Sequence, residues 1–315
     1  MGIFYSREEN GSVNEEAVIL GKLRAKTSGL FIGQDYKKLR FRAVYAVMFL
    51  IMLIISLACI LPPIWIFFNS LKDTAEFASV PPTIIPHSFH PEKIVEVWNT
   101  LNFWKFYLNS GILVLGEWIF AIVFNGLAGY VLACIKPKGS AVLNTLVFWT
   151  MMLPTSLNIV PLFISFVDVP IFHVNITNTY LPMWLMAGAN AFYIMLFRNF
   201  FLGIPRSYIE AANLDGCSAL STFVKIILPM SKPILMVVSI FSITASWGSF
   251  LWPYIVMKDP NLFPITVKIF ALKGKALTMD KYMLVVLLAI IPPTIIYAFC
   301  SKHIMGGLSM SGIKG

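Results

Sequence analysis

The chain has 315 residues, of which 58% are hydrophobic and only 12% are charged, and its formal net charge is +9. This composition excludes an ordinary soluble domain and a disordered chain, and it is typical of a membrane protein with several spans. The positive charge does not call for a nucleic-acid partner, because membrane proteins collect basic residues in their cytoplasmic segments.

Six apolar runs are long enough, or nearly so, to cross a bilayer core, which takes roughly 20 residues of helix. We therefore predict an all-α membrane protein with six transmembrane helices. Several of the runs contain proline, which spanning helices tolerate where neighbours satisfy the freed carbonyl, often beside a cavity. The predicted spans cover about residues 44–68, 107–135, 141–167, 181–197, 234–257 and 283–301.

The basic residues indicate the orientation of these spans. Residues 1–41 form a charged tail, predicted to be cytoplasmic, ahead of a transmembrane domain at 42–315. With the tail inside, 16 of the 24 lysines and arginines fall in cytoplasmic segments. This bias follows the positive-inside rule and predicts that both termini are cytoplasmic. The first span is too long for a signal-peptide core, so no signal peptide is expected.

The sequence offers little to support enzyme chemistry. It contains no G-x-x-x-x-G-K-[ST] nucleotide loop, no serine elbow, no H-E-x-x-H pattern and no catalytic pair of carboxylates. Its four histidines have no metal-ligand spacing, and its four cysteines follow no repeating pattern, so we expect free thiols. We predict no catalytic residue, no metal site and no cofactor on this chain.

A polar segment between the fourth and fifth runs is the most informative part of the chain. Pro205 suits the first turn of a helix that can run from Arg206 to Asp215, and Gly216 can end it in the left-handed conformation. Ser218 can cap a second helix over 219–227. Pro229 then favours a non-helical Leu228. The segment is either an ordinary connection between spans or a surface that a partner grips.

Polar residues inside the apolar runs are candidates for a solute pathway. We single out Asn158, Asn190, Trp247 and Ser249, which can bond hydroxyls or stack against sugar rings. Neutral polar groups of this kind more often join neighbouring helices than contact a ligand, so each residue taken alone is better explained by contacts between helices. Glu117 is the only acid well inside an apolar run, and it is either a functional group or a residue near the membrane interface.

At this point the residues resemble a known family, the permeases of ABC importers, and more narrowly the maltose-type sugar permeases. The segment from Ile204 to Pro233 is similar to their cytoplasmic loop, with its E-A-A-x-x-D-G core and a downstream L-P-x-x-x-P. Further matches in order cover nearly the whole chain after Arg42. They lie at residues 68–72, 81–86, 109–110, 128–130, 151–154, 159–162, 196–201, 247–253 and, ending in G-x-K-G, 311–315.

The resemblance implies a type I ABC importer in a bacterial cell membrane. Two related permeases would form the pathway, two cytoplasmic ATPases that carry ATP and Mg²⁺ would drive it, and an extracytoplasmic binding protein would deliver a sugar or oligosaccharide. The loop at about 203–229 would dock in a cleft of the ATPase as a helix in a groove. The residues that this assigns to coupling are Glu210, Ala211, Ala212, Asp215, Gly216, Leu228 and Pro229.

Two departures from the family pattern accompany these matches. Cys217 stands where the family has alanine, and Gly248 with Ser249 replaces a W-N-[DE] polar pair, which indicates a different or larger solute. The alternatives are a permease of the same fold for a non-sugar solute and an autonomous secondary transporter. The second would need an inverted repeat and ion-coupling carboxylates near the midplane, and of these only Glu117 is available.

Overall fold

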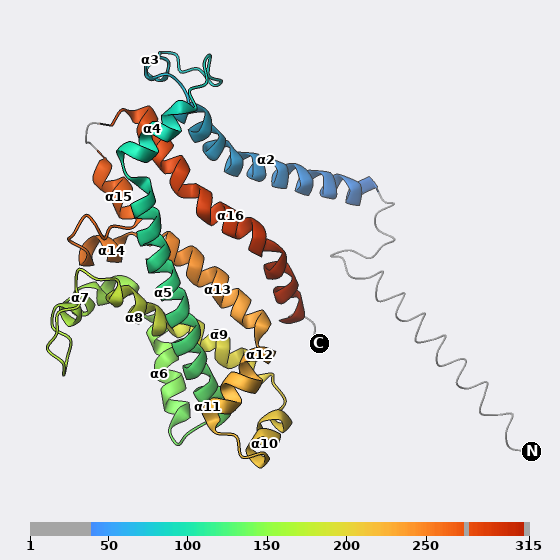
Figure 1. Ribbon diagram of the computed structural model, residues 1–315. Coiled ribbons are helices and arrows are strands. Elements are labelled where there is room, and N and C mark those ends of the chain that lie inside the picture. Colours follow the sequence, from blue (N-terminus) through green and yellow to red (C-terminus); the bar gives the residue numbers. More distant parts are fainter. Residues whose placement is uncertain (1–38, 274–276, 312–315) are drawn as a thin grey trace, which may run out of the picture. The chain divides into compact units, whose positions relative to one another are not determined.

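The computed structural model describes residues 39–273 and 277–311, which are helical for most of their length (Figure 1). The predicted tail at 1–41 lies outside the described residues apart from its last three, which begin the first helix. The terminal G-x-K-G motif, at 312–315, lies outside them too. The described elements are α2 (Leu39–Ser70), α3 (Thr74–Phe77), α4 (Glu92–Thr100), α5 (Phe103–Tyr130), η2 (Val131–Ile135), α6 (Ser140–Met152), η3 (Thr155–Asn158), α7 (Ile159–Val167), α8 (Leu181–Gly188), α9 (Ala191–Leu202), α10 (Arg206–Leu214), α11 (Ala219–Thr222), η4 (Phe223–Ile227), α12 (Leu228–Met230), α13 (Lys232–Trp247), α14 (Leu251–Val256), α15 (Ile265–Leu272) and α16 (Met279–Ser311).

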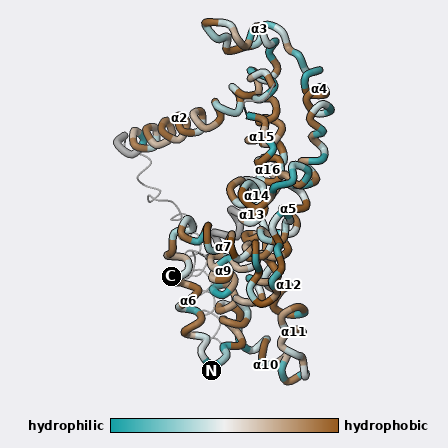
Figure 2. Tube along the Cα trace, turned by 90° about the vertical axis from the view of Figure 1, so that its left-hand side faces the viewer, coloured by the Kyte–Doolittle hydropathy of each residue, from teal (hydrophilic) through white to brown (hydrophobic). Residues whose placement is uncertain are grey.

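The chain divides into two units, residues 1–65 and residues 66–315. The first unit consists, in its described part, of most of α2. This helix is apolar on all sides, and its large side chains from Val44 to Ile64 are exposed. Figure 2 shows its mostly hydrophobic colouring. A helix that is hydrophobic all round is typical of a membrane span, so α2 matches the first predicted span.

The second unit is built around α5, which packs mainly against α8, α9 and α13. Its largest buried cluster joins α5, α9 and α13 to the polar segment after α9. It includes Ala121, Phe197, Ile227 and Val238, which have no exposed surface. Lipid is as apolar as leucine, so close packing rather than hydrophobic burial holds such helices together. Small residues on α5 supply the close approach.

Gly129 and Gly116 mark the two tightest contacts of α5. A Cβ atom on Gly129 would lie 2.7 Å from the Cβ of Phe197 and 2.9 Å from the backbone nitrogen of Arg198, both on α9. A Cβ atom on Gly116 would lie 2.1 Å from the indole ring of Trp184 on α8. Only glycine allows these helix backbones and rings to come so close.

Four helices are long and apolar enough to cross a membrane, and two bent helix pairs would raise the number to six. The third predicted span is α6 together with η3 and α7, which meet at an angle of 100°. Pro154 causes the break, because the residue before a proline disfavours helix, and Leu153 is extended with ψ 130°. The helices before and after Ser231 meet at 84°. The described residues therefore contain four to six candidate spans. The predicted fourth span is interrupted between α8 and α9. The predicted fifth span, 234–257, is not continuous, because α13 ends at Trp247 and α14 begins at Leu251.

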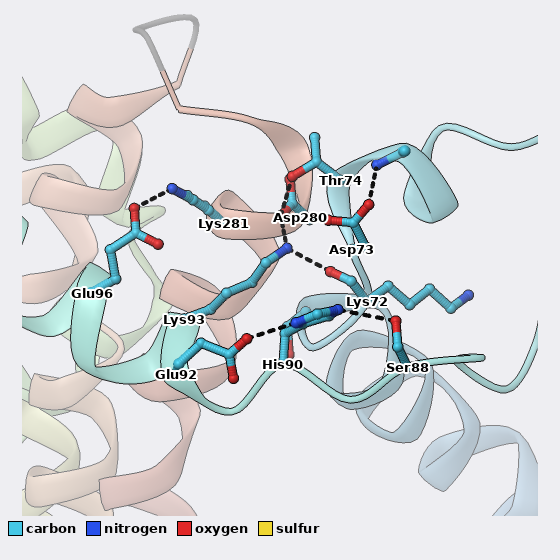
Figure 3. A network of polar contacts seen from close by, with 12 residues as sticks. Lys72, Asp73, Thr74, Ser88, His90, Glu92, Lys93, Glu96, Asp280 and Lys281 are labelled. Atoms are coloured by element: carbon cyan, nitrogen blue, oxygen red, sulfur yellow. Dashed lines mark hydrogen bonds and ion pairs between the residues drawn. The ribbon is translucent and has the colours of Figure 1, made fainter.

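A buried ion pair fastens α4 to the start of α16 (Figure 3). Lys93 Nζ lies 2.6 Å from Asp280 Oδ2 and donates a second hydrogen bond, 2.5 Å long, to the carbonyl of Lys72. The hydroxyl of Thr74 donates to the same carboxylate at 3.2 Å. The Asp280 side chain has no exposed surface. Beside this pair, Lys281 and Glu96 form a second pair that is more exposed, with 26% and 52% of the two side chains accessible.

The loop that follows α3 is organised by a second carboxylate. Glu76 Oε1 accepts hydrogen bonds from the hydroxyl of Thr83 and from the backbone N–H of His87, each 2.9 Å long, and it lies 2.9 Å from the His87 ring. Desolvation acts to raise the pKa of Glu76. The hydrogen bonds from His87 and Thr83 outweigh it and lower the pKa to about 2.

We expect Gly129→Ala to destabilise the protein, because the added methyl group meets the backbone of α9. Overpacking of this kind costs roughly 1–3 kcal/mol. The matched control is Gly111→Ala on the same helix, where a Cβ atom would meet nothing within 4 Å. The midpoint of thermal unfolding in detergent should fall for Gly129→Ala and stay near the wild-type value for Gly111→Ala. Equal midpoints for the two variants would contradict the packing role of Gly129.

We expect Lys93→Met to lower the thermal unfolding midpoint far more than Lys281→Met. Removing Lys93 leaves a buried carboxylate without its cation, which costs about 3–5 kcal/mol. Removing Lys281 breaks an exposed pair worth roughly 0–1 kcal/mol. Combining Lys93→Met with Asp280→Leu should recover much of the loss, since no unpaired charge then remains. A double variant as unstable as Lys93→Met alone would show that packing, and not charge pairing, sets the effect.

Candidate functional site

The polar segment after α9 folds as two short helices around a glycine turn. α10 begins after Pro205, which has φ −57°, and its last carbonyls are satisfied by the turn. Gly216 has φ +74°, and the backbone N–H groups of Gly216 and Cys217 donate to the carbonyls of Asn213 and Ala212 at 3.1 and 2.9 Å. This is the left-handed helix ending that the sequence predicts for Gly216.

The second half of the segment begins as predicted and then differs from the prediction. Ser218 Oγ accepts a hydrogen bond of 3.2 Å from the backbone N–H of Ser221, which caps α11. The chain then makes a π turn, η4, and continues into α12. The expectation that Leu228 leaves the helix is wrong, because its φ and ψ of −61° and −45° are helical. Pro229 follows the π turn in the first turn of α12, where a missing N–H removes no helical hydrogen bond.

The segment has an anchored side and an exposed side. Ala212 is buried and Ile209 is half-buried, and Ile209 packs against the same cluster that contains Phe197 and Val238 of the long helices. Of the residues predicted to couple, Ala212 therefore packs inside this chain, and Leu228 is half-buried. The exposed ones are Glu210, Ala211, Asp215, Gly216 and Pro229. Leu214, which the sequence reading missed, is 89% exposed at the tip of α10.

A cavity of about 370 Å³ separates the base of α10 from the end of α5 and its π turn η2. Its charged lining residues are Lys136, Arg206 and Glu210. Lys136 adopts the left-handed conformation with φ 49°, and its N–H closes the π turn on the carbonyl of Val131 at 2.9 Å. On one side α10 packs against the buried cluster through Ile209, and on the other side Arg206 and Glu210 face the cavity.

A smaller cavity of about 170 Å³ lies between α5, α8 and the segment after α13. It brings together two predicted pathway residues, Asn190 and Ser249, with Glu117. Trp252, Met183, Met186 and Ala187 complete its lining. Amide, hydroxyl, indole and carboxylate groups thus converge on one space inside the membrane-spanning helices, an arrangement that suits hydroxyl-rich solutes.

Asn125 holds two residues of the cavity lining in place through hydrogen bonds to their backbone. It is fully buried on α5, and its amide donates to the carbonyls of Ala121 and Ala187, each at 2.8 Å. Its Oδ1 accepts from the backbone N–H of Asn190 at 2.9 Å. Asn125 therefore pairs with one backbone group on each side of the break between α8 and α9. Asn190 itself caps α9 by accepting from the N–H of Tyr193 at 3.2 Å.

The other two predicted pathway residues lie elsewhere. Trp247 sits in the buried cluster of α4, α15 and α16, and its indole donates to the carbonyl of Ala289 at 3.1 Å. Asn158 is exposed at the end of η3, outside the cavity lining. The sequence reading missed Trp252, although it stands three residues after Ser249 and carries the indole of the cavity.

The structure offers no metal centre within its described residues, since they contain no group of three or more His, Cys, Asp or Glu side chains that could hold an ion. Cys59, Cys134 and Cys217 are free thiols, as predicted. The side chain of Cys300 lies outside the described part.

The sequence of the chain matches known transport proteins over most of its length. Residues 125–305 match the family described as "Binding-protein-dependent transport system inner membrane component". The chain is 30% identical over 268 residues to the sn-glycerol-3-phosphate transport system permease protein UgpE of Salmonella typhi, covering 82% of this chain and 93% of that protein. It is 28% identical over 270 residues to the arabinooligosaccharides transport system permease protein AraQ of Bacillus subtilis (strain 168), covering 84% and 94%.

The fold is also found in a solved structure. A chain from a bacterial ABC transporter involved in the import of the acidic polysaccharide alginate superposes with a TM-score of 0.72. The two chains are 22% identical, and the match covers 87% of this chain and 99% of the other. The arrangement of helices is therefore that of a type I ABC importer permease.

Proposed function

We propose that this chain pairs with a second permease to form the path for a sugar or oligosaccharide. The chain belongs to the family of binding-protein-dependent transport system inner membrane components and is an ABC importer permease. Two cytoplasmic ATPases that hold ATP and Mg²⁺ would drive the import, and an extracytoplasmic binding protein would deliver the solute. The observation that carries the proposal is the exposed helix α10, anchored in the same buried cluster as the long helices.

Coupling would run through this anchor. Glu210 and Asp215 would provide polar contacts to the ATPase, and the exposed Leu214 would fill an apolar depression in it. Because Ile209 packs against the cluster of Phe197 and Val238, a displacement of α10 would move α9 and α13 with it. ATP binding would favour the closed ATPase pair and thereby shift the permeases toward their outward-open state.

A sugar is the solute that the cavity supports best. Asn190 and Ser249 offer hydrogen bonds to hydroxyl groups, and Trp252 offers an aromatic face. A relative named for arabinooligosaccharides is consistent with this proposal. The second candidate is a non-sugar solute carried by the same fold, which a relative named for sn-glycerol-3-phosphate favours.

The proposed orientation follows the positive-inside rule in an inner membrane. Both termini, the turn at 136–140 and the coupling segment would be cytoplasmic. The segments at 72–102, 168–180 and 257–278 would face the binding protein. The Lys93–Asp280 pair would then stabilise the outer surface.

We expect Gly216→Val to abolish most of the ATP hydrolysis that the loaded binding protein stimulates, because valine at φ +74° strains the turn that presents α10. The matched control is Gly139→Val, at another glycine with positive φ (+88°) and open space around it. Both variants carry similar backbone strain, but only the first alters the segment of α10. Reconstituted importer, assayed with and without the loaded binding protein, separates the two.

A direct test of the docking surface is Glu210→Lys, which reverses an exposed charge without touching the core. We expect weaker co-purification of the ATPase and stimulated hydrolysis lowered several-fold. If both Gly216→Val and Glu210→Lys assemble normally and hydrolyse ATP at the wild-type rate, the assignment of α10 as the ATPase contact is wrong.

The orientation predicts opposite labelling of two exposed positions. In a chain without its native cysteines, Phe172→Cys should react with an impermeant thiol reagent added outside intact cells, and Lys138→Cys should react only after the membrane is opened. Both side chains are exposed, so access depends on the side of the membrane. Reaction of both positions from the same side would contradict six spans in this orientation.

A further inference from the structure

Glu117 places a carboxylate in the cavity among neutral groups. It lies on α5 and lines the space together with Asn190, Ser249 and Trp252. Ionisable side chains inside spanning helices are costly and rare, and a functional role is their default interpretation. Among the described residues, no lysine or arginine lines this cavity or pairs with Glu117.

The neighbours of Glu117 on α5 pack this part of the helix against α8 and α13. On one side, Gly116 allows the ring of Trp184 to pack against the helix, and the indole donates to the carbonyl of Leu113 at 3.2 Å. On the other side, Trp118 Nε1 donates to the hydroxyl of Ser239 on α13 at 2.7 Å. These two contacts fix the rotation of α5 about its axis, so Glu117 is held between α8 and α13.

A buried hydroxyl lies beside this carboxylate. Ser246 on α13 is only 2% exposed and lies close enough to Glu117 for a side-chain hydrogen bond. Buried hydroxyls are normally paired, and among the described residues no other partner is found for the Ser246 hydroxyl. A carboxylate can accept more hydrogen bonds than one serine donates, so Glu117 keeps acceptor capacity toward the cavity.

We propose that Glu117 makes this cavity selective by charge, so that it admits uncharged or amine-bearing polyhydroxylated solutes and repels phosphorylated or carboxylated ones. A carboxylate accepts hydrogen bonds from hydroxyl or ammonium groups but has nothing to offer an anionic oxygen. This inference rests on the proposed function, since it assumes that the cavity belongs to the solute path. It distinguishes the chain from relatives named for sn-glycerol-3-phosphate and from the transporter named for acidic alginate.

The experiment measures the charge preference of the cavity without any knowledge of the solute. Ala187 lines the cavity with a small side chain, and Ala187→Cys introduces a reporter thiol in a chain whose native cysteines are replaced. In the assembled importer in detergent, its reaction rates with a trimethylammonium methanethiosulfonate and with a sulfonate methanethiosulfonate are compared. Each rate is divided by that of a free thiol in solution.

We expect the cationic reagent to react about tenfold faster than the anionic one with Glu117 present, because opposite charges experience the nearby carboxylate with opposite sign. Glu117→Gln should bring the ratio close to one, and Glu117→Asp should preserve the preference. The control is Phe172→Cys in an exposed loop, where Glu117→Gln should leave the ratio unchanged.

A ratio near one with Glu117 present, or an unchanged ratio in Glu117→Gln, would overturn the proposal. Labelling does not require transport. A charge preference in an importer that takes up no sugar would therefore refute the proposed function alone, and sugar uptake without a charge preference would refute this inference alone.

Discussion

A helix that breaks inside a membrane must find partners for the backbone groups it frees, because lipid offers none. The second unit of this chain meets that requirement at its centre through one side chain. Asn125 supplies a donor for the carbonyl of Ala187 and an acceptor for the N–H of Asn190, the two groups on either side of the break between α8 and α9. An apolar residue at this position would leave both groups unpaired, at several kcal/mol each by the standards of a hydrocarbon environment.

The break has consequences in both directions along the chain. Toward the membrane interior, it places Asn190 at the cavity, so the residue that caps α9 is also the residue that can meet a solute. Toward the coupling segment, α9 continues through Phe197 and Phe201 into the buried cluster that receives Ile209. The same interruption of a helix thus positions the cavity that we propose for the solute and directs the chain toward α10, the helix that we propose for coupling.

The sequence was most informative where structure is determined by neighbouring residues. Gly216 predicts a helix end because glycine tolerates positive φ, and Ser218 predicts a helix start because its hydroxyl can cap one. Both predictions are confirmed. The resemblance to ABC permeases extended these local signals to a fold, which the structure confirms. The helical Leu228 was not predictable in this way, because the π turn that accommodates Pro229 has no local sequence signal. Nor was the burial of Ala212, which depends on which face of α10 meets the long helices.

The polar groups inside the membrane posed a harder problem. The sequence does not distinguish two roles for such residues, because each can either join helices or contact a solute. This applies to Asn125, Asn158, Asn190 and Trp247. Their roles depend on long-range packing, which turns Trp247 toward α16 and Asn190 toward the cavity. The role of Glu117 was ambiguous for the same reason. It lies ten residues from the start of an apolar run, a position that can be at the membrane interface or in the interior.

Shared architecture and solute identity therefore depend on different residues in this protein. The close contacts of Gly116 and Gly129, the bridge made by Asn125 and the anchored turn at Gly216 determine how the helices pack and how α10 is presented. None of these residues carries a charge that a solute would sense. A cavity of about 170 Å³ exposes only a few side chains, so a single carboxylate or its absence can change the charge of the whole space. The name of a relative's solute is weaker evidence about this chain than the lining of its own cavity.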